Sequence, residues 1–349
     1  MRPMYYPAMR HYALTLLGLL LYLPGAATAA ESTEEVRRAT PFDIPAWFKT
    51  SFLDLKEDVA QATANHKRLM LYIGQEGCPY CRELMQNNFS QKPIVDYTRK
   101  HFDVLAINMW GDAEVTDFSG QHLAEKEFAK QLKVQFTPTL LFFDEQGKVV
   151  LRLNGYLPPH QFTAALQFVA GHKHETSSFR EYYASLSPAP ASGTLHQAPY
   201  MLQPPYTLTR TPASKPLLVL FEQKVCGECD VLHQKILADD TSRALLNKLD
   251  VVLLDMWSAT PVVTPEGKTR TASAWARDLG LVYAPGAVLF GPDGKEIIRI
   301  EGMLKTFHVQ SVLDYAASGA YREQPEFQRY VETRAAALRE KGVAVELWK

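Results

Sequence analysis

Short apolar runs recur along the chain, and between them apolar residues return at helical spacing. Leu69 to Ile73, Val104 to Asn108 and Thr139 to Asp144 are short, largely apolar and partly β-branched, which predicts buried strands. Glu125 to Leu132 and Pro159 to Val169 place apolar residues three and four apart, which predicts amphipathic helices. The pattern therefore predicts strands that alternate with helices.

A hairpin completes this series. Val149 to Asn154 is a further strand-like run, and it follows Glu145-Gln146-Gly147, whose glycine can adopt a positive φ in a turn. Helices are expected from Leu53 to Asn65, before the first strand, and across Glu83 to Phe89, after it. Strand–helix–strand segments that end in a hairpin and a helix predict an α/β fold with a mixed central sheet flanked by helices.

The whole series occurs twice, at an offset of 147 or 148 positions. Lys67-Arg68-Leu69-Met70-Leu71 returns as Lys215-Pro216-Leu217-Leu218-Val219, and Met109-Trp110 returns as Met256-Trp257. Because the offset hardly changes along the chain, we interpret the two halves as one unit copied with almost no insertion.

Composition marks the expected domain boundaries. Residues 185–212 are rich in Pro, Ser and Ala, which is typical of a semi-extended linker that is not packed. We therefore expect one domain over residues 43–184 and a second over residues 213–349. Prolines leave the second domain without the leading helix, and a terminal helix from Glu326 to Lys341 is expected to pack on it.

Bulk composition is that of a globular protein. The chain has 349 residues, of which 46% are hydrophobic and 21% charged, so two domains can each bury a core. The net charge is −1, and no basic stripe interleaves with aromatic residues, which argues against nucleic acid as a partner. No dimerisation module is visible in the sequence, and we expect a monomer.

The first 30 residues predict a cleavable secretory signal. Arg2 and Arg10 precede an apolar stretch from Ala13 to Leu23, and Ala27-Thr28-Ala29 offers small residues for cleavage. The alternative is an uncleaved anchor, although this stretch is short for a helix that spans about 30 Å of hydrocarbon. We expect the mature protein outside the cytoplasm, where disulfides persist.

All four cysteines lie in two Cys-x-x-Cys turns, Cys78-Pro79-Tyr80-Cys81 and Cys226-Gly227-Glu228-Cys229. Each turn follows a strand-like run, and each is followed 57 or 56 residues later by a proline, Pro138 or Pro285. Static disulfides are one interpretation. A shared zinc site is disfavoured, because 144 residues separate the pairs, and we expect no metal. This spacing favours thiol–disulfide exchange.

The first turn has the features of a reactive thiol. A cysteine at a helix start meets unpaired backbone N–H groups, which favour its thiolate, so Cys78 is the expected nucleophile at the protein surface. Cys81, one turn further, is expected to be more shielded and to resolve the mixed disulfide. Pro79 suits the first helical position, and Tyr80 is either a turn residue or a substrate contact.

The distant prolines are the second expected part of each site. Pro138 follows Thr137 and begins a strand, where its missing N–H is tolerated. A cis Thr137–Pro138 bond would leave backbone groups free to pair with a substrate strand. Ala284 and Pro285 occupy the matching place in the second half. These four residues, together with Pro79 and Tyr80 of the first turn, form the expected substrate-binding surface.

The strand, Cys-Pro-Tyr-Cys turn, helix and Thr-Pro strand of residues 67–170 resemble the thioredoxin superfamily. More narrowly, Asn108-Met109-Trp110-Gly111-Asp112 and Phe136-Thr137-Pro138-Thr139 resemble the SoxW-type periplasmic thioredoxins. The resemblance covers nearly all of the mature chain, as two tandem thioredoxin-like domains. It implies cis prolines at Pro138 and Pro285, reduction of protein disulfides outside the cytoplasm, and electrons supplied by a membrane thiol transporter of the DsbD or CcdA type.

The sequence also departs from that family. Tyr72 and Leu220 stand where thioredoxins usually carry a buried Asp, and Glu76, Glu222 and Glu228 are the candidates to replace its proton relay. The Pro-Tyr dipeptide is that of glutaredoxins, but no glutathione-binding pattern follows it. Glu228 is expected to raise the pKa of Cys226 by like-charge repulsion.

The leading hypothesis is a periplasmic thiol–disulfide oxidoreductase that reduces protein disulfides without a cofactor. An isomerase or oxidase is one alternative, and a non-catalytic binding module or copper–thiolate carrier is another. The second pair is expected to pass electrons to the first, or else to be a weaker exchanger or a structural disulfide.

Overall fold

The computed structural model describes residues 44–186, 191–343 and 345. The expected secretory signal at residues 1–30 lies outside this range, as does part of the expected linker. Within the described residues, no helix combines the length and apolar character needed to cross a membrane.

The first half contains a four-stranded sheet in the order β2-β1-β5-β6. Strand β1 (Arg68–Gly74) runs parallel to β2 (Phe102–Asn108) and antiparallel to β5 (Thr139–Phe143). Strand β6 (Val149–Asn154) closes the hairpin with β5. The expected mixed sheet is confirmed, with strand bounds within two residues of the sequence prediction.

The second half repeats this sheet, in the order β13-β12-β8-β9. Strand β8 (Leu217–Glu222) is parallel to β9 (Asp250–Asp255) and antiparallel to β12 (Gly286–Phe290), which pairs with β13 (Glu296–Glu301). The same order and directions in both halves confirm that one unit occurs twice.

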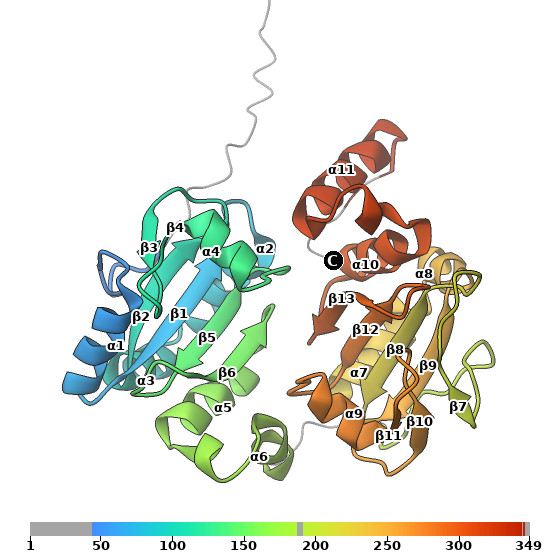
Figure 1. The fold of residues 1–349 in the computed structure, drawn as a ribbon, viewed down its shortest axis with the longest axis horizontal. Coiled ribbons are helices and arrows are strands. Elements are labelled where there is room, and N and C mark those ends of the chain that lie inside the picture. Colours follow the sequence, from blue (N-terminus) through green and yellow to red (C-terminus); the bar gives the residue numbers. More distant parts are fainter. Residues whose placement is uncertain (1–43, 187–190, 344, 346–349) are drawn as a thin grey trace, which may run out of the picture. The chain divides into compact units, whose positions relative to one another are not determined.

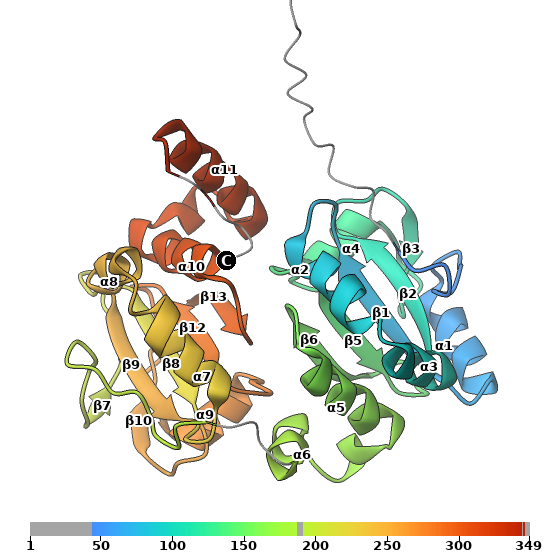
Figure 2. The ribbon, with the colours of Figure 1, turned by 180° about the vertical axis from the view of Figure 1, so that it is seen from behind.

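Helices cover both faces of the first sheet. Figure 1 shows α1 (Leu55–Ala64) and α4 (Glu125–Gln131) on one side, and Figure 2 brings α3 (Lys92–His101) and α5 (Pro159–Ala170) to the front on the other. The alternation of β1 explains this arrangement, since successive side chains point to opposite faces. Leu69, Leu71 and Ile73 belong to the core cluster of α1 and α4, whereas Met70 and Tyr72 belong to that of α3 and α5.

The second sheet is covered in the same way. Helix α9 (Ala272–Asp278) packs through Trp275 on one face, and α8 (Asp240–Leu246) and α10 (Thr306–Ser318) pack on the other. The terminal helix α11 (Phe327–Glu340) lies on α10, where the rings of Phe327 and Tyr315 are 5.2 Å apart. Packing of the terminal helix on the second half is therefore confirmed.

Several elements were not expected from the sequence. Helices α3 and α8 were missed, because their segments mix charged and apolar residues without a clear strand or loop signal. Two small hairpins were also missed. One joins β3 (Glu114–Thr116) to β4 (His122–Ala124), and the other joins β10 (Pro261–Val263) to β11 (Thr269–Thr271). In the first half, α6 (Phe179–Ser185) follows α5 and begins with a capping box at Ser178.

The segment expected to be an unpacked linker is partly packed, which corrects that interpretation. Strand β7 (Tyr206–Thr207) pairs with β10, and Met201 forms a bridge with Val251. Leu208 is only 1% exposed. The apolar residues between the prolines bury their side chains on the second sheet, and this outweighs the composition of the segment. As expected, no helix precedes β8 within residues 191–216.

Candidate functional site

The first cysteine pair lies at the start of the helix that follows β1. Cys78 is the N-cap of α2 (Pro79–Glu83), with Pro79 in the first turn and Gly77 before it at φ 68°. Its Sγ accepts a hydrogen bond from the backbone N–H of Cys81 at 3.0 Å and is joined to Cys81 in a disulfide. A π-helical turn, Leu84–Asn88, continues α2. The position expected for Cys78 at a helix start is confirmed.

The distant proline of the first half lies beside this pair. The Thr137–Pro138 peptide bond is cis, and Thr139 pairs with Ile73 at the end of β1. The Thr137 hydroxyl lies 3.2 Å and its carbonyl oxygen 3.4 Å from Cys78 Sγ. The strand pairing thus brings together residues that the sequence separates by 59 positions.

The second pair has the same framework with one difference. Cys226 is the N-cap of α7 (Gly227–Val231) and accepts the N–H of Cys229 at 3.0 Å; the two cysteines form a disulfide, and a π-helical turn follows. The Ala284–Pro285 bond is also cis. Ala284 has no hydroxyl, so the second sulfur lacks the side-chain contact that Thr137 makes in the first half.

The expectation of a surface sulfur on Cys78 is wrong for this conformation. Cys78 and Cys81 are both 5% exposed, so the nucleophile is no more open than its partner. Thr137 lies against the sulfur, and Tyr80 is itself buried. The Tyr80 hydroxyl accepts the backbone N–H of Lys305 at 2.7 Å, and its ring centre lies 5.0 Å from that of His308. These neighbours cover the turn that sequence reasoning placed in solvent.

The second turn makes its own contacts. Glu228 accepts a hydrogen bond from the Gln161 side-chain amide at 2.8 Å, and His160 lies 3.8 Å from the same carboxylate. The side chain of Glu228 is 23% exposed. The expected effect of Glu228 on the pKa of Cys226 stays a prediction.

A tryptophan–glutamine contact beside each turn was not anticipated. Trp110 Nε1 donates to Gln75 Oε1 at 2.6 Å, and Trp257 Nε1 donates to Gln223 Oε1 at 2.8 Å. Each glutamine lies three residues before the first cysteine of its pair. Both pairs of residues were visible in the sequence repeat, but nothing in the repeat showed that they touch. The contact ties the indole ring to the loop that leads into the turn.

Of the three acids considered for a proton relay, only one is buried. Glu222 is 1% exposed and lies 2.8 Å from the ring of His233, whereas Glu76 is exposed and Glu228 is partly exposed. Tyr72 and Leu220, which occupy the usual acid position, are 1% and 2% exposed.

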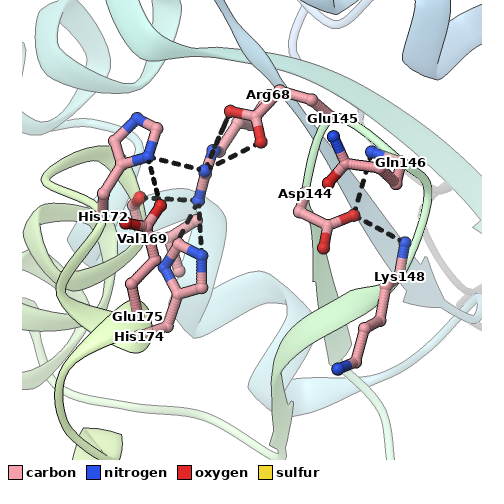
Figure 3. Close-up of polar contacts among 9 residues, drawn as sticks. All are labelled: Arg68, Asp144, Glu145, Gln146, Lys148, Val169, His172, His174 and Glu175. Atoms are coloured by element: carbon pink, nitrogen blue, oxygen red, sulfur yellow. Dashed lines mark hydrogen bonds and ion pairs between the residues drawn. The ribbon is translucent and has the colours of Figure 1, made fainter.

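His172 and His174, which follow α5, contact a buried arginine (Figure 3). Arg68 forms hydrogen bonds with both Glu145 oxygens at 2.8 and 3.1 Å, and its guanidinium lies 3.0 Å from His172 and 3.4 Å from His174. Burial, followed by the charge of Arg68, lowers the pKa of His174. No cluster of His, Cys, Asp and Glu suited to a metal occurs among the described residues. The network anchors the turn after α5 to the start of β1.

Comparison with known proteins agrees with this geometry. A family model described as a thioredoxin-like domain matches residues 55–170 and 209–317. The thiol:disulfide interchange protein DsbD of Pseudoalteromonas atlantica is 27% identical over 113 residues, 32% of this chain and 17% of that protein. DsbD of Photorhabdus laumondii is 32% identical over 105 residues, 30% of this chain and 16% of that protein. The matches thus span about a sixth of the length of these relatives.

Solved structures also resemble parts of the chain. A thioredoxin-fold protein from Helicobacter pylori has 28% identity and a TM-score of 0.31, and covers 38% of this chain and 92% of its own. A thioredoxin from Thermus thermophilus has 25% identity and a TM-score of 0.27, with 36% and 95% covered. Since the two regions matched by the family model together span more than half of the sequence, the protein belongs to the family of proteins with thioredoxin-like domains.

Proposed function

We propose that the protein reduces disulfides in protein substrates outside the cytoplasm, as a periplasmic thioredoxin of the SoxW type. The observation that carries this proposal is the surroundings of Cys78 Sγ, which has the Cys81 N–H at 3.0 Å and the Thr137 hydroxyl at 3.2 Å. Two donors directed at one sulfur favour its thiolate, which is the form that attacks disulfides.

The reaction follows from these positions. In the reduced protein, the Cys78 thiolate attacks one sulfur of the substrate disulfide; a new S–S bond forms, and the electron pair of the broken bond leaves on the other substrate sulfur, which takes a proton. The Cys81 thiolate then attacks Cys78 Sγ and releases the second substrate thiol. The Cys78–Cys81 disulfide is left behind, two electrons having passed to the substrate.

Substrate binding is assigned to the residues around the sulfur. Thr137 and Pro138 border it on one side, and Pro79 and Tyr80 form the turn itself. Ala284 and Pro285 hold the matching place beside the second pair. An extended substrate segment can pair with the backbone next to each cis proline, as in other cases of strand addition.

Access to the sulfur requires a change in the cover over the first turn. The Tyr80–Lys305 hydrogen bond and the contact with His308 must be released before a polypeptide reaches Cys78.

The second pair is the proposed electron source for the first. We assign the supply of electrons to a membrane thiol transporter of the DsbD or CcdA type, which reduces Cys226–Cys229 by dithiol exchange. Glu228, next to the thiolate, is expected to make this pair the more reducing of the two, and that sets the direction towards Cys78 and Cys81.

The direction of electron flow is tested by the reduction potential of each pair and by its redox state in cells. A reductase predicts free thiols at Cys78 and Cys81 in vivo and a potential near about −270 mV. An oxidised pair with a potential near about −120 mV would show an oxidase instead. Rapid acid quenching, alkylation and mass spectrometry of the two cysteine peptides give both readings for each pair.

A further inference from the structure

Each cysteine turn is in contact with the opposite half of the chain, and both halves belong to one compact unit. In the first turn, Tyr80 accepts the backbone N–H of Lys305 at 2.7 Å, and its ring centre lies 5.0 Å from that of His308. In the second turn, Glu228 accepts the side-chain amide of Gln161 at 2.8 Å. Lys305 and His308 lie at the start of α10 and Gln161 lies at the start of α5. Each turn is thus covered by the beginning of a helix from the other half.

The residues in these contacts occupy equivalent places in the repeat. Tyr80 and Glu228 are each the third residue of their Cys-x-x-Cys turn. Gln161 and His308 are the third residues of α5 and α10, the helices that follow the hairpin in each half. The contact that the second half makes with the first is therefore repeated in the opposite direction. Such a reciprocal interface is the kind that forms between two copies related by a twofold axis.

Asn154 and Glu301 lie at the centre of this arrangement. They are the last residues of β6 and β13, and each precedes the glycine that ends the hairpin of its half, Gly155 or Gly302. The Asn154 side-chain amide donates a hydrogen bond to the Glu301 carboxylate at 3.1 Å. Two equivalent residues can meet only near a twofold axis. The contacts at the two cysteine turns are therefore parts of one interface.

The helix at the end of the first half extends this interface beside the second turn. Arg180, in α6, donates a hydrogen bond to the backbone oxygen of Met256 at 3.1 Å, and its guanidinium lies 4.3 Å from the ring centre of Trp257. Trp257 donates in turn to Gln223, three residues before Cys226. The first half therefore contacts the tryptophan–glutamine pair that adjoins the second cysteine turn.

The terminal helix of the second half makes the corresponding contacts beside the first turn. Gln328, in α11, stands at the place of Arg180 in the repeat, at an offset of 148. Gln328 accepts the side-chain amide of Gln75, three residues before Cys78, at 3.2 Å. It also donates to the backbone oxygen of Gln135 at 3.0 Å. Each half thus contacts the other both at the cysteine turn and at the loop that leads into it.

We propose that each half of the chain is the docking partner of the other, and that the two cysteine turns are covered and uncovered together. Because the contacts form one interface, its separation exposes Cys78 and Cys226 in a single step. A polypeptide that approaches either sulfur competes with the opposite half of the same chain. This inference concerns access to the two disulfides, and it does not depend on the direction of electron flow.

The test measures how fast dithiothreitol reduces each disulfide in the full chain, with alkylation and mass spectrometry to report both pairs in one sample. Gln161→Ala removes a hydrogen bond to the Glu228 carboxylate, and a bond to a charged group favours the bonded state by about tenfold or more. Both pairs should therefore be reduced about tenfold faster, by the same factor. Gln328→Ala, in the second half, removes bonds between neutral groups and should speed both pairs by about fivefold.

An equal factor at both pairs is the result that supports the proposal. If Gln161→Ala speeds only the second pair, the cover over that turn opens by itself; if it speeds only the first pair, the substitution has loosened its own half. Either result overturns the proposal, as do unchanged rates in both variants. Gln167→Ala is the matched control, since Gln167 is an exposed residue of the same helix, and it should change both rates by less than about twofold.

Discussion

The hydroxyl of Thr137 lies 3.2 Å from Sγ of Cys78, and the equivalent residue in the second half, Ala284, has no hydroxyl to offer. This contact is the clearest chemical difference between two sites that otherwise share a cis proline and a backbone N–H donor. It implies that the first thiolate is the better stabilised of the two.

Thr137→Val should raise the pKa of Cys78 in the reduced protein by about one to two units, because a hydrogen bond to a charged group contributes about 1.5–3 kcal/mol and one pKa unit is about 1.4 kcal/mol. The pH dependence of iodoacetamide alkylation of Cys78 measures this change. Ala284→Thr is the matched gain-of-contact variant and should lower the pKa of Cys226. Unchanged alkylation profiles in both variants would show that the hydroxyl does not act on the sulfur.

Tyr80→Phe should speed the reduction of the Cys78–Cys81 disulfide. The substitution keeps the ring next to His308 but leaves the Lys305 N–H without its acceptor, at a cost of about 1–3 kcal/mol to the covered conformation. The rate of reduction by dithiothreitol is the measurement. Tyr156→Phe is the control, since that hydroxyl makes only a 3.5 Å contact with Asn87 on the exposed side. Equal rates in wild type and Tyr80→Phe would mean that this hydrogen bond does not limit access.

His308 should make the folded protein sensitive to acid. Burial lowers its pKa from 6.5 to about 4, and its Nδ1 has no hydrogen-bond partner among the described residues. The unfolded chain therefore binds a proton at a pH where the folded chain does not, so stability is lost as pH falls from about 6.5 towards 4. The loss from this residue is about 3 kcal/mol. Urea unfolding of wild type and His308→Gln across that range should show a weaker pH dependence in the variant, and parallel curves would contradict the assignment.

The electron relay predicts a dependence of the first pair on the second. In cells that express the Cys226→Ser, Cys229→Ser double variant, Cys78 and Cys81 should accumulate as a disulfide, because the dithiol that reduces them is missing. Acid-quenched alkylation reports this state. Wild-type levels of free Cys78 thiol in the double variant would show that electrons reach the first pair directly.

The sheet, the cysteine turns and the prolines could be predicted from the sequence because their signals are local or repeated. Leu69 to Ile73 is apolar without interruption, and the fixed offset between the halves makes each motif support the other. Helix α3 could not be recognised, since Lys92–His101 exposes most of its length and buries little more than Ile94 and Thr98.

Two findings could not be predicted from the sequence for a different reason: the burial of the sulfurs, and the contact between Glu222 and His233. Both depend on which side chains from distant segments meet, such as Tyr80 with Lys305, and no periodicity encodes such contacts. The packing of Tyr206 and Leu208 in the expected linker is a related case, where a few apolar side chains outweigh a proline-rich composition.

The most direct measurement is the capture of a substrate by the full-length Cys81→Ser variant. Without the resolving thiol, Cys78 should remain joined to its partner, and non-reducing gels followed by mass spectrometry should reveal protein adducts that disappear in Cys78→Ser, Cys81→Ser. Cys229→Ser is the matched control, because it leaves Cys226 as a single thiol in the second half, as Cys81→Ser leaves Cys78 in the first. A protein that exchanges disulfides through Cys78 predicts reducible adducts at this residue, and their absence from cells that express the folded variant would contradict the proposed function.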